Sequence, residues 1–261
     1  YRSRDERLIA FSNHHYYDGR LHTFPAASAG TTETGVRFVP LVGSYDRGKS
    51  GTTEVEAKAV VARLVELLMA EGPRHSVGVV TFSMTQQRLV EDLFQREREG
   101  NSVLDDRARS GAEPPFIKNL ENVQGDERDV MLFSVAFGPD AAGKMLMNFG
   151  PLNKAGGERR LNVAITRARF RLEVFAILRT DHIDLGRTAA VGVRHLKDFL
   201  RYAEHGPKSL GLTSAPTGKG ADSPFESEVG REIERLGFPV DPQVGCGGYR
   251  IDLGVKDPDR P

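Results

Sequence analysis

Four apolar runs rich in valine and phenylalanine constrain the fold of this chain more than any other feature. They cover residues 36–42, 76–82, 129–137 and 171–178, and segments with helical spacing lie between them. Strands that are apolar on both faces and alternate with helices are typical of a parallel sheet that helices cover on both sides. The sequence therefore predicts a doubly wound α/β domain over residues 1–205.

The helical pattern is clearest over residues 54–70. Thr53 and Glu56 have the spacing of a capping box at its start, and Gly72 with Pro73 marks its end. We therefore expect the helix to begin directly after Thr53. Its apolar side chains recur at helical spacing: Val55, Ala59, Ala62, Val65 and Met69.

Residues 206–223 contain Gly, Pro, Ser, Thr and Lys but few side chains to bury, which is typical of a linker. A further helix is expected to start with Ser223 as its cap and Pro224 in its first position, and to end at Gly237 before two short strands. These elements are too few to bury a stable core. We therefore expect residues 224–261 to be the start of a second domain, and the chain to be a fragment.

Composition limits the classes of function. The chain has 36 basic and 36 acidic residues, so its net charge indicates no nucleic-acid or membrane partner and any basic surface is local. Its 39% apolar and 28% charged residues exclude collagen, coiled coil and wholesale disorder. The single cysteine, Cys246, excludes internal disulfides and a multi-cysteine zinc site. No apolar run approaches the roughly 18 residues that span a bilayer, so we expect no membrane partner and a cytoplasmic location.

Residues 43–50, GSYDRGKS, match the phosphate-loop pattern G-x-x-x-x-G-K-[ST]. In such a loop the lysine and the Ser or Thr lie in the first helical turn, where backbone N–H groups and the helix dipole converge on phosphate. Here the helix is expected to begin only after Thr53, which leaves Lys49 in a solvated turn. A self-contained phosphate-loop ATPase that uses Lys49 is therefore the weaker alternative.

Two polar segments lie next to predicted strands. Residues 158–171 hold five arginines, and on a helical wheel Arg160 and Arg167 project together beside a narrow apolar stripe. They are either solvated surface arginines or phosphate ligands, because Arg offers a fixed fork of donors. Residues 124–129, QGDERD, are either a plain charged turn or part of a ligand site before a buried strand.

Four segments stand in a recognisable order: YRSRDERLIAFSNHHYYDGRL, VGVVTFSMTQQRLV, LENVQGDERDVMLFS and RRLNVAITRAR. In this order they resemble the C-terminal RecA-like domain of superfamily 1 helicases of the up-frameshift type, and they span about residues 1–205. The resemblance implies a RecA-like fold without its own phosphate loop. It also implies the second motor domain of an ATP-dependent helicase or translocase.

For the nucleotide, the resemblance implies that ATP with Mg²⁺ binds between this domain and a missing N-terminal RecA-like lobe of the same chain. Tyr1 matches the tyrosine that stacks on adenine, and Arg2 matches the arginine that reaches the terminal phosphate. Gln124 and Gly125 match the motif that couples nucleotide to nucleic acid, and Glu127 matches the glutamate that contacts the ribose.

Arg167 matches the arginine finger of the family, whose charge is expected to stabilise the transition state of hydrolysis. Because the other lobe supplies the phosphate loop, this fragment alone is expected to hydrolyse no ATP. The rival interpretations are the phosphate-loop ATPase described above and a RecA-like interaction module without catalysis.

For nucleic acid, the resemblance implies contacts between the block TFSMTQ and the backbone of a single strand. The helicase resemblance leaves DNA and RNA both open, and the nuclease resemblance described below favours DNA. Thr81, Ser83 and Gln86 fall in this block, although Phe82 replaces the usual proline. Asn119 stands where threonine is usual and is expected to contact the strand as well. Binding of this kind rests on phosphate contacts and tolerates many sequences.

The C-terminal segment FESEVGREIERLGFPVDPQVGCGGYRIDLGV is similar to the start of very-short-patch-repair-like nuclease domains of the PD-(D/E)xK class. The resemblance implies that Glu226 and Asp252 are ligands of a divalent metal. The E-x-K strand of the class is expected beyond Pro261, which leaves the site incomplete. For Glu226, a charge favoured by the helix dipole is the plainer alternative. A zinc site at His14, His15 and His22 is a weak alternative, because adjacent residues point in different directions.

Overall fold

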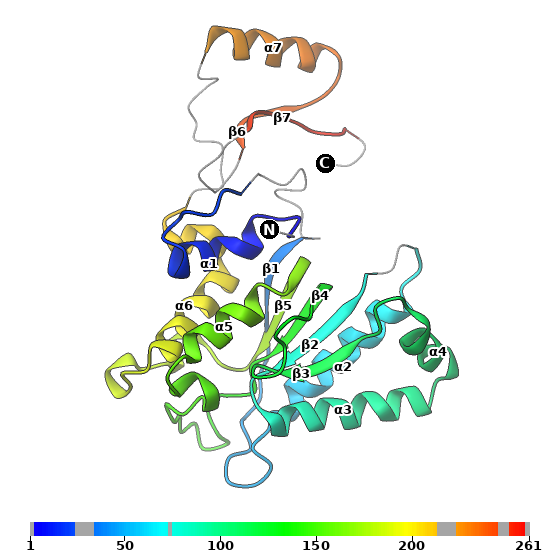
Figure 1. The fold of residues 1–261 in the computed structure, drawn as a ribbon, viewed down its shortest axis with the longest axis vertical. Helices are drawn as coiled ribbons and strands as arrows, with labels where there is room; N and C mark the ends of the chain where they lie inside the picture. Colours follow the sequence, from blue (N-terminus) through cyan, green and yellow to red (C-terminus); the bar gives the residue numbers. More distant parts are fainter. Residues whose placement is uncertain (1–2, 24–33, 73–74, 213–222, 245–250, 259–261) are drawn as a thin grey trace.

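The computed structural model describes residues 3–23, 34–72, 75–212, 223–244 and 251–258. Five parallel strands form its main sheet in the order β1-β5-β4-β2-β3 (Figure 1). All five strands begin at one edge of the sheet, the amino edge, and end at the other, the carboxyl edge. The strands are β1 (Gly35–Pro40), β2 (Val77–Thr81), β3 (Phe116–Asn119), β4 (Arg128–Ser134) and β5 (Ala168–Ala176).

Helices cover both faces of this sheet, as Figure 1 shows. One face carries α1 (Arg7–Tyr16), α5 (Gly157–Ile165) and α6 (Val191–His205). The other face carries α2 (Glu54–Met69), α3 (Met84–Glu99) and α4 (Ser102–Ser110). Short 3-10 helices are η1 (Gly150–Asn153), η2 (Thr180–His182), η3 (Leu185–Arg187) and η4 (Gly206–Leu210). The predicted α/β class, a doubly wound parallel sheet of the RecA-like kind, is confirmed.

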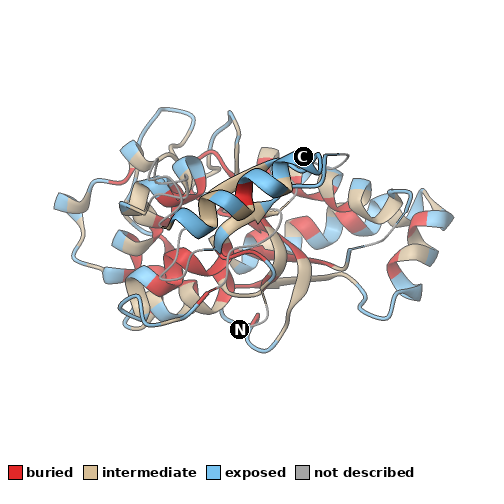
Figure 2. Ribbon diagram, turned by 90° about the horizontal axis from the view of Figure 1, so that it is seen from above, coloured by how far each residue is buried: buried red, intermediate tan, exposed pale blue. Residues whose placement is uncertain are grey.

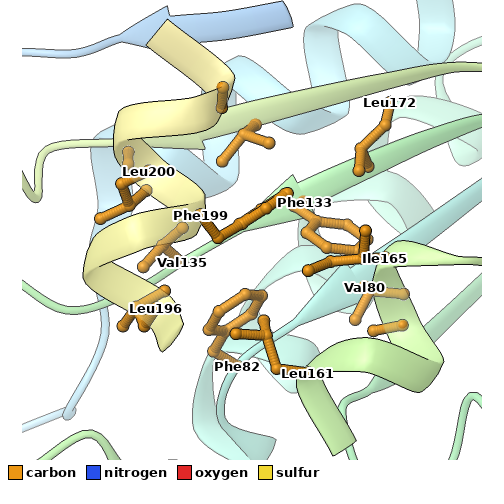
Figure 3. Close-up of a cluster of buried hydrophobic side chains, with 14 of the residues drawn as sticks. Val80, Phe82, Phe133, Val135, Leu161, Ile165, Leu172, Leu196, Phe199 and Leu200 are labelled. Carbon is orange, nitrogen blue, oxygen red and sulfur yellow. The ribbon is translucent and has the colours of Figure 1, made fainter. Parts of the chain in front are cut away.

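The sheet separates two clusters of buried apolar side chains, one under each layer of helices. In the cluster below α5 and α6, the rings of Phe82 and Phe133 meet edge to face with centroids 5.7 Å apart (Figure 3). Phe199 of α6 lies 6.4 Å from the same Phe133 ring, measured between centroids. Buried apolar area stabilises the fold by about 25 cal/mol per Å². The two clusters therefore hold the strand ends, which carry the candidate sites, in fixed positions.

The predicted capping box of α2 is wrong, although the helix begins where expected. Thr53 occupies the N-cap position, but its hydroxyl makes no capping bond and is buried without a partner. Glu56 accepts instead from the N–H groups of Ala136 and Ile177, at 2.7 and 2.9 Å, beyond the ends of β4 and β5. A buried carboxylate needs donors, and the backbone N–H groups just past the two strand ends supply them.

The arginine-rich segment is not the single helix that its spacing predicts. α5 ends at Ile165, where the Thr166 hydroxyl donates to two carbonyl oxygens of the last turn at 3.0 and 3.1 Å. β5 begins at Ala168, because its backbone pairs with β4 on one side and β1 on the other. Arg160 therefore lies on the helix and Arg167 in the turn after it, and the two do not share a helix face.

Residues 206–212, which composition assigns to a linker, pack against the sheet domain. Pro207 is buried, and Leu210 and Leu212 lie against the apolar cluster of α1 and α6. The packed part of the chain therefore extends beyond residue 205. Residues 213–222 of the predicted linker, Tyr1, Arg2 and Cys246 lie outside the described residues.

The C-terminal unit consists of α7 (Pro224–Arg235) and the antiparallel strands β6 (Val240–Val244) and β7 (Ile251–Val255). Ser223 caps α7 by accepting from the Glu226 N–H at 3.2 Å, as the sequence predicts. The helix packs on both strands but buries only Gly230, and Figure 2 shows the rest of it partly or fully exposed. Within the described ranges, no helix combines the length and the apolar character that crossing a bilayer requires.

Candidate functional sites

A cleft of about 590 Å³ opens at the amino edge of the sheet, where β4 and β5 begin. Three segments that are far apart in the sequence meet there: residues 3–21, residues 125–127 and residues 166–169. The Arg4 N–H donates to the Arg169 carbonyl at 2.8 Å, which fixes the first of these segments beside β5. The structure thus brings Gly125, Glu127 and Arg167 to one cleft, beside the residues that follow Tyr1 and Arg2.

The side chain of Arg167 is held by neutral groups. Its Nε donates to the Val163 carbonyl at 2.7 Å, and one terminal nitrogen donates to the Thr166 hydroxyl at 3.1 Å. No carboxylate in the described part of the chain forms an ion pair with it. Arg167 is half-buried. Its guanidinium is therefore fixed in direction while its positive charge is left for a ligand of the cleft.

The other arginines of the segment differ from Arg167 in their partners. Arg169 lies between two carboxylates, with its Nε 3.0 Å from Asp129 Oδ1 and a terminal nitrogen bonded to Glu113. Arg171 pairs with Glu173 at 3.0 Å, and the side chain of Arg159 is 87% exposed. Arg169 and Arg171 are therefore partly buried and ion-paired, and only Arg159 is the solvated surface arginine of the plainer interpretation.

Residues 120–127 connect the two edges of the sheet. They leave β3 at the carboxyl edge and enter β4 at the amino edge, because the two strands run in the same direction. Gly125 has a φ of +90°, which favours glycine, and a Cβ there would meet nothing within 4 Å. Gln124 is exposed and Glu127 is half-buried. The open backbone at Gly125 therefore faces the cleft without a side chain in the way.

This connection is anchored along its length. Leu120 and Val123 are buried in the apolar cluster under α5. Lys118 on β3 pairs with Asp126 at 2.6 Å. The connection is therefore a fixed part of the fold rather than a loose loop.

The predicted nucleic-acid residues lie at the carboxyl edge. Thr81, Gln86 and Asn119 are buried, and only Ser83 is partly exposed. Ser83 caps α3 by accepting from the Gln86 N–H at 3.2 Å. The side-chain oxygen of Asn119 accepts from the Glu121 N–H at 2.9 Å, while its nitrogen is buried without a partner.

A smaller pocket of about 220 Å³ lies next to Ser83 and Asn119. Lys154 lines the same pocket from the end of η1 and brings a positive charge to it. Ser83 and the exposed first turn of α3 are thus the part of the TFSMTQ block that a nucleic acid can reach directly. Thr81 and Gln86 can act on such a ligand only through the positions of their neighbours.

Residues 43–50 match the phosphate-loop motif but do not have the geometry of a phosphate loop. α2 begins at Glu54, beyond Lys49, whose side chain is exposed. The Ser50 N–H and hydroxyl both donate to Asp46 Oδ2, at 3.2 and 2.7 Å, and these bonds lower the pKa of Asp46. The donors that a phosphate would need are therefore bonded to a carboxylate of the loop itself, whose charge repels phosphate. A cleft of about 650 Å³ beside this loop is a feature that the sequence did not predict.

The predicted nuclease acids lie on different elements of the C-terminal unit. Glu226 is in the first turn of α7, where the Ser223 hydroxyl donates to its Oε1 at 3.0 Å. Asp252 is exposed on β7 and accepts from Gln243 Nε2 at 3.3 Å. In the described ranges, no group of three or more His, Cys, Asp or Glu side chains is arranged to hold a metal ion.

The histidines of α1 have structural neighbours. The His15 ring lies 4.3 Å from the Phe11 ring and 5.1 Å from the His195 ring, between centroids. Burial, together with the nearby His195, lowers the pKa of His15 to about 4. His22 is exposed. The rings of His14 and His15 meet nearly edge to face, with centroids 4.9 Å apart.

Comparison with known proteins gives the family. An uncharacterised ATP-dependent helicase of Mycoplasma genitalium is 36% identical over 216 residues, which are 81% of this chain and 18% of that protein. Its homologue in Mycoplasma pneumoniae is 34% identical over 209 residues, or 78% of this chain and 18% of that protein. This chain thus spans about a fifth of the length of these relatives.

The solved C-terminal domain of a possible DNA helicase from Lactobacillus plantarum aligns with 75% of this chain and 92% of its own, at 12% identity and a TM-score of 0.37. Residues 1–177, most of the chain, match the family model described as AAA domain. The chain belongs to the AAA domain family.

Proposed function

We propose that this chain is the C-terminal motor domain of an ATP-dependent helicase or translocase of superfamily 1. The relatives named as ATP-dependent helicases support this proposal, although each is much longer than the chain. The observation that carries it is the unpaired charge of Arg167 on a cleft that Gly125 and Glu127 also line. In the longer protein, an N-terminal RecA-like lobe closes this cleft around ATP.

The residues of the cleft then divide the work on the nucleotide. Glu127 contacts the ribose, and Gln124 and Gly125 respond to the phosphates. Arg167 supplies positive charge to the transferring phosphoryl group, as an arginine finger does. Tyr1 stacks on adenine, and Arg2 reaches the terminal phosphate. Mg²⁺ and the phosphate loop belong to the other lobe, so this chain binds ATP only in part.

Single-stranded DNA lies along the carboxyl edge of the sheet in this proposal. Ser83, the first turn of α3 and Lys154 face the strand, and Asn119 lies beneath them. The N-terminus of α3 offers backbone N–H groups and a positive dipole end to phosphate oxygens. Contacts of this kind bind the backbone and leave the base sequence unread.

The C-terminal unit is the beginning of a nuclease-like domain in this proposal. The arrangement of α7 against β6 and β7 supports it, because Glu226 and Asp252 lie on elements that pack on each other. A divalent metal would bind there only with ligands from a further strand. Replacing Asp252 with Asn in the full-length protein should then abolish metal-dependent DNA cleavage and leave ATP turnover unchanged.

The test of the motor assignment is Arg167→Ala in the full-length helicase. We expect kcat for DNA-stimulated ATP hydrolysis to fall on the order of a thousandfold, with nucleotide binding largely kept, because the charge acts mainly in the transition state. The matched control is Arg159→Ala, which removes an exposed arginine from the neighbouring helix α5. An unchanged kcat in Arg167→Ala would favour the interaction module without catalysis.

A further inference from the structure

A chain of buried polar side chains joins four segments at the carboxyl edge of the sheet. It consists of the side chains of Glu56, Gln86 and Ser134 together with the backbone of Thr53, and all four residues have 0% of their surface exposed. Buried polar groups destabilise a fold unless they are hydrogen-bonded, so a connected set of this size restricts the arrangement of its segments. None of these contacts is needed to explain the nucleotide cleft at the opposite edge.

Glu56 fixes the ends of two central strands. Its Oε1 accepts from the Ile177 N–H at 2.9 Å, just past β5. Its Oε2 accepts from the Ala136 N–H at 2.7 Å and from the Ser134 hydroxyl at 2.9 Å, at the end of β4. Ala136 has a φ of +58°, which is unusual for a residue with a Cβ. The bond that the Ala136 N–H donates to Glu56 therefore stabilises this left-handed turn.

Gln86 extends the network from β4 to the starts of two helices. Its Nε2 donates to the Ser134 hydroxyl oxygen and to the Thr53 carbonyl, both at 3.0 Å. Its Oε1 accepts from the Thr53 N–H at 2.9 Å. The amide thus uses both donor hydrogens. Gln86 links the first turn of α3 to Thr53, the N-cap residue of α2, and to Ser134 at the end of β4.

The surface above Gln86 carries the polar groups that are proposed to contact the nucleic acid. The Gln86 N–H is the donor that orients Ser83 Oγ, at 3.2 Å. Thr85 is exposed beside it, and its hydroxyl donates to the Gly51 carbonyl at 2.9 Å. A shift of Gln86 therefore moves the N-terminus of α3 and the hydroxyl groups on it.

We propose that Glu56 is a positioning residue for nucleic-acid binding, which acts through Ser134 and Gln86 to hold the N-terminus of α3 in place. Glu56 itself is fully buried and touches no ligand. Only a group with two acceptor oxygens serves both strand ends, because the partners of Glu56 named above are all donors. This inference rests on the proposed function, specifically on the contact between the carboxyl edge and a single strand.

The experiment measures binding of a fluorescent single-stranded oligodeoxynucleotide to the whole chain at pH 8 and low salt. We expect Glu56→Gln to weaken binding by about tenfold or more, because binding groups must be held within about half an ångström. Ser134→Ala should weaken it as well. The double variant should lose less than the product of the two effects, since both residues act along one path.

The control is Leu64→Ala, which opens a cavity in the same helix α2 but touches none of the network. It should lower Tm at least as much as Glu56→Gln while leaving Kd within about twofold of wild type. If Glu56→Gln does not fold, Ser134→Ala alone carries the test, because it removes only a hydroxyl.

Binding by Glu56→Gln or Ser134→Ala within about twofold of wild type would overturn the inference, as would an equal loss in Leu64→Ala. Failure of the wild-type chain to bind the oligonucleotide is a distinct result. It would contradict the proposed nucleic-acid edge itself and the positioning role that depends on it.

Discussion

Arg167 and Arg169 are two residues apart and chemically identical, yet their side chains have different partners. Asp129 and Glu113 neutralise Arg169, whereas Arg167 is held by a carbonyl and a hydroxyl and keeps its charge. The sequence could predict that arginines gather near a strand but not which one is unpaired, because the carboxylates come from other segments. The same holds for Glu56, whose spacing from Thr53 predicts a cap while its partners lie on two strands.

The titration of Glu56 gives a prediction at this scale. Burial raises its pKa from 4.5 to about 7, despite the hydrogen bonds from Ile177, Ala136 and Ser134 that lower it. The folded state therefore binds more protons than the unfolded state between these values, so the stability from this group is complete below pH 4.5 and is lost as the pH rises to about 7.

We expect Glu56→Gln to abolish this dependence. Between pH 5 and 7.5, wild type should lose up to about 3 kcal/mol more of its free energy of unfolding than the variant does. Urea unfolding of both proteins at several pH values measures the difference. The comparison is needed because His15, with a pKa lowered to about 4, acts in the opposite direction below about pH 6.5 in both proteins. Parallel curves would show that Glu56 ionises with an ordinary pKa.

At the scale of elements, two glycines allow α5, α6 and η1 to meet closely. A Cβ on Gly192 at the start of α6 would lie 2.4 Å from the Leu152 carbonyl oxygen, and one on Gly157 of α5 would lie 2.6 Å from the same atom. Sequence periodicity found the strands and α2 because their apolar faces repeat. It missed β3, a four-residue strand at the edge of the sheet. It also extended α5 into β5, because the spacing of nearby residues does not show which distant strands pair.

This packing predicts a strong effect of one added methyl group. Gly192→Ala should reduce the free energy of unfolding by about 1–3 kcal/mol, because the clash is with backbone that cannot turn aside. Gly100→Ala is the matched control, since its Cβ would meet the nearest atom at an ordinary 3.6 Å. Chemical denaturation of the two variants and the wild type compares them. Equal stability of Gly192→Ala and Gly100→Ala would mean that α6 shifts freely on η1.

At the scale of the whole molecule, the order of apolar runs predicted the parallel sheet, and the order of four motifs predicted which residues form the candidate sites. Neither predicted that Thr81 and Gln86 are buried. A motif match places a residue along the chain, but its burial depends on packing between elements that the motif does not describe. Lys49 illustrates the reverse case, in which a matching motif lies in a loop with the wrong geometry.

Under the proposed function, this chain supplies only one wall of the nucleotide cleft and should not hydrolyse ATP alone. We expect the purified chain of 261 residues to show no ATP turnover above background, with or without single-stranded DNA. A phosphate-release assay on the chain and on Lys49→Ala measures this. Turnover that Lys49→Ala abolishes would contradict the proposal and restore the phosphate-loop ATPase.

The anchored connection over residues 120–127 has one further consequence. Leu120 and Val123 lie in the core and Asp126 pairs with Lys118, so the segment is held at three points between the two edges of the sheet. Under the proposed function, a nucleotide at Glu127 and a DNA strand near Asn119 would both act on this one anchored segment. Binding at one edge of the sheet would then alter binding at the other.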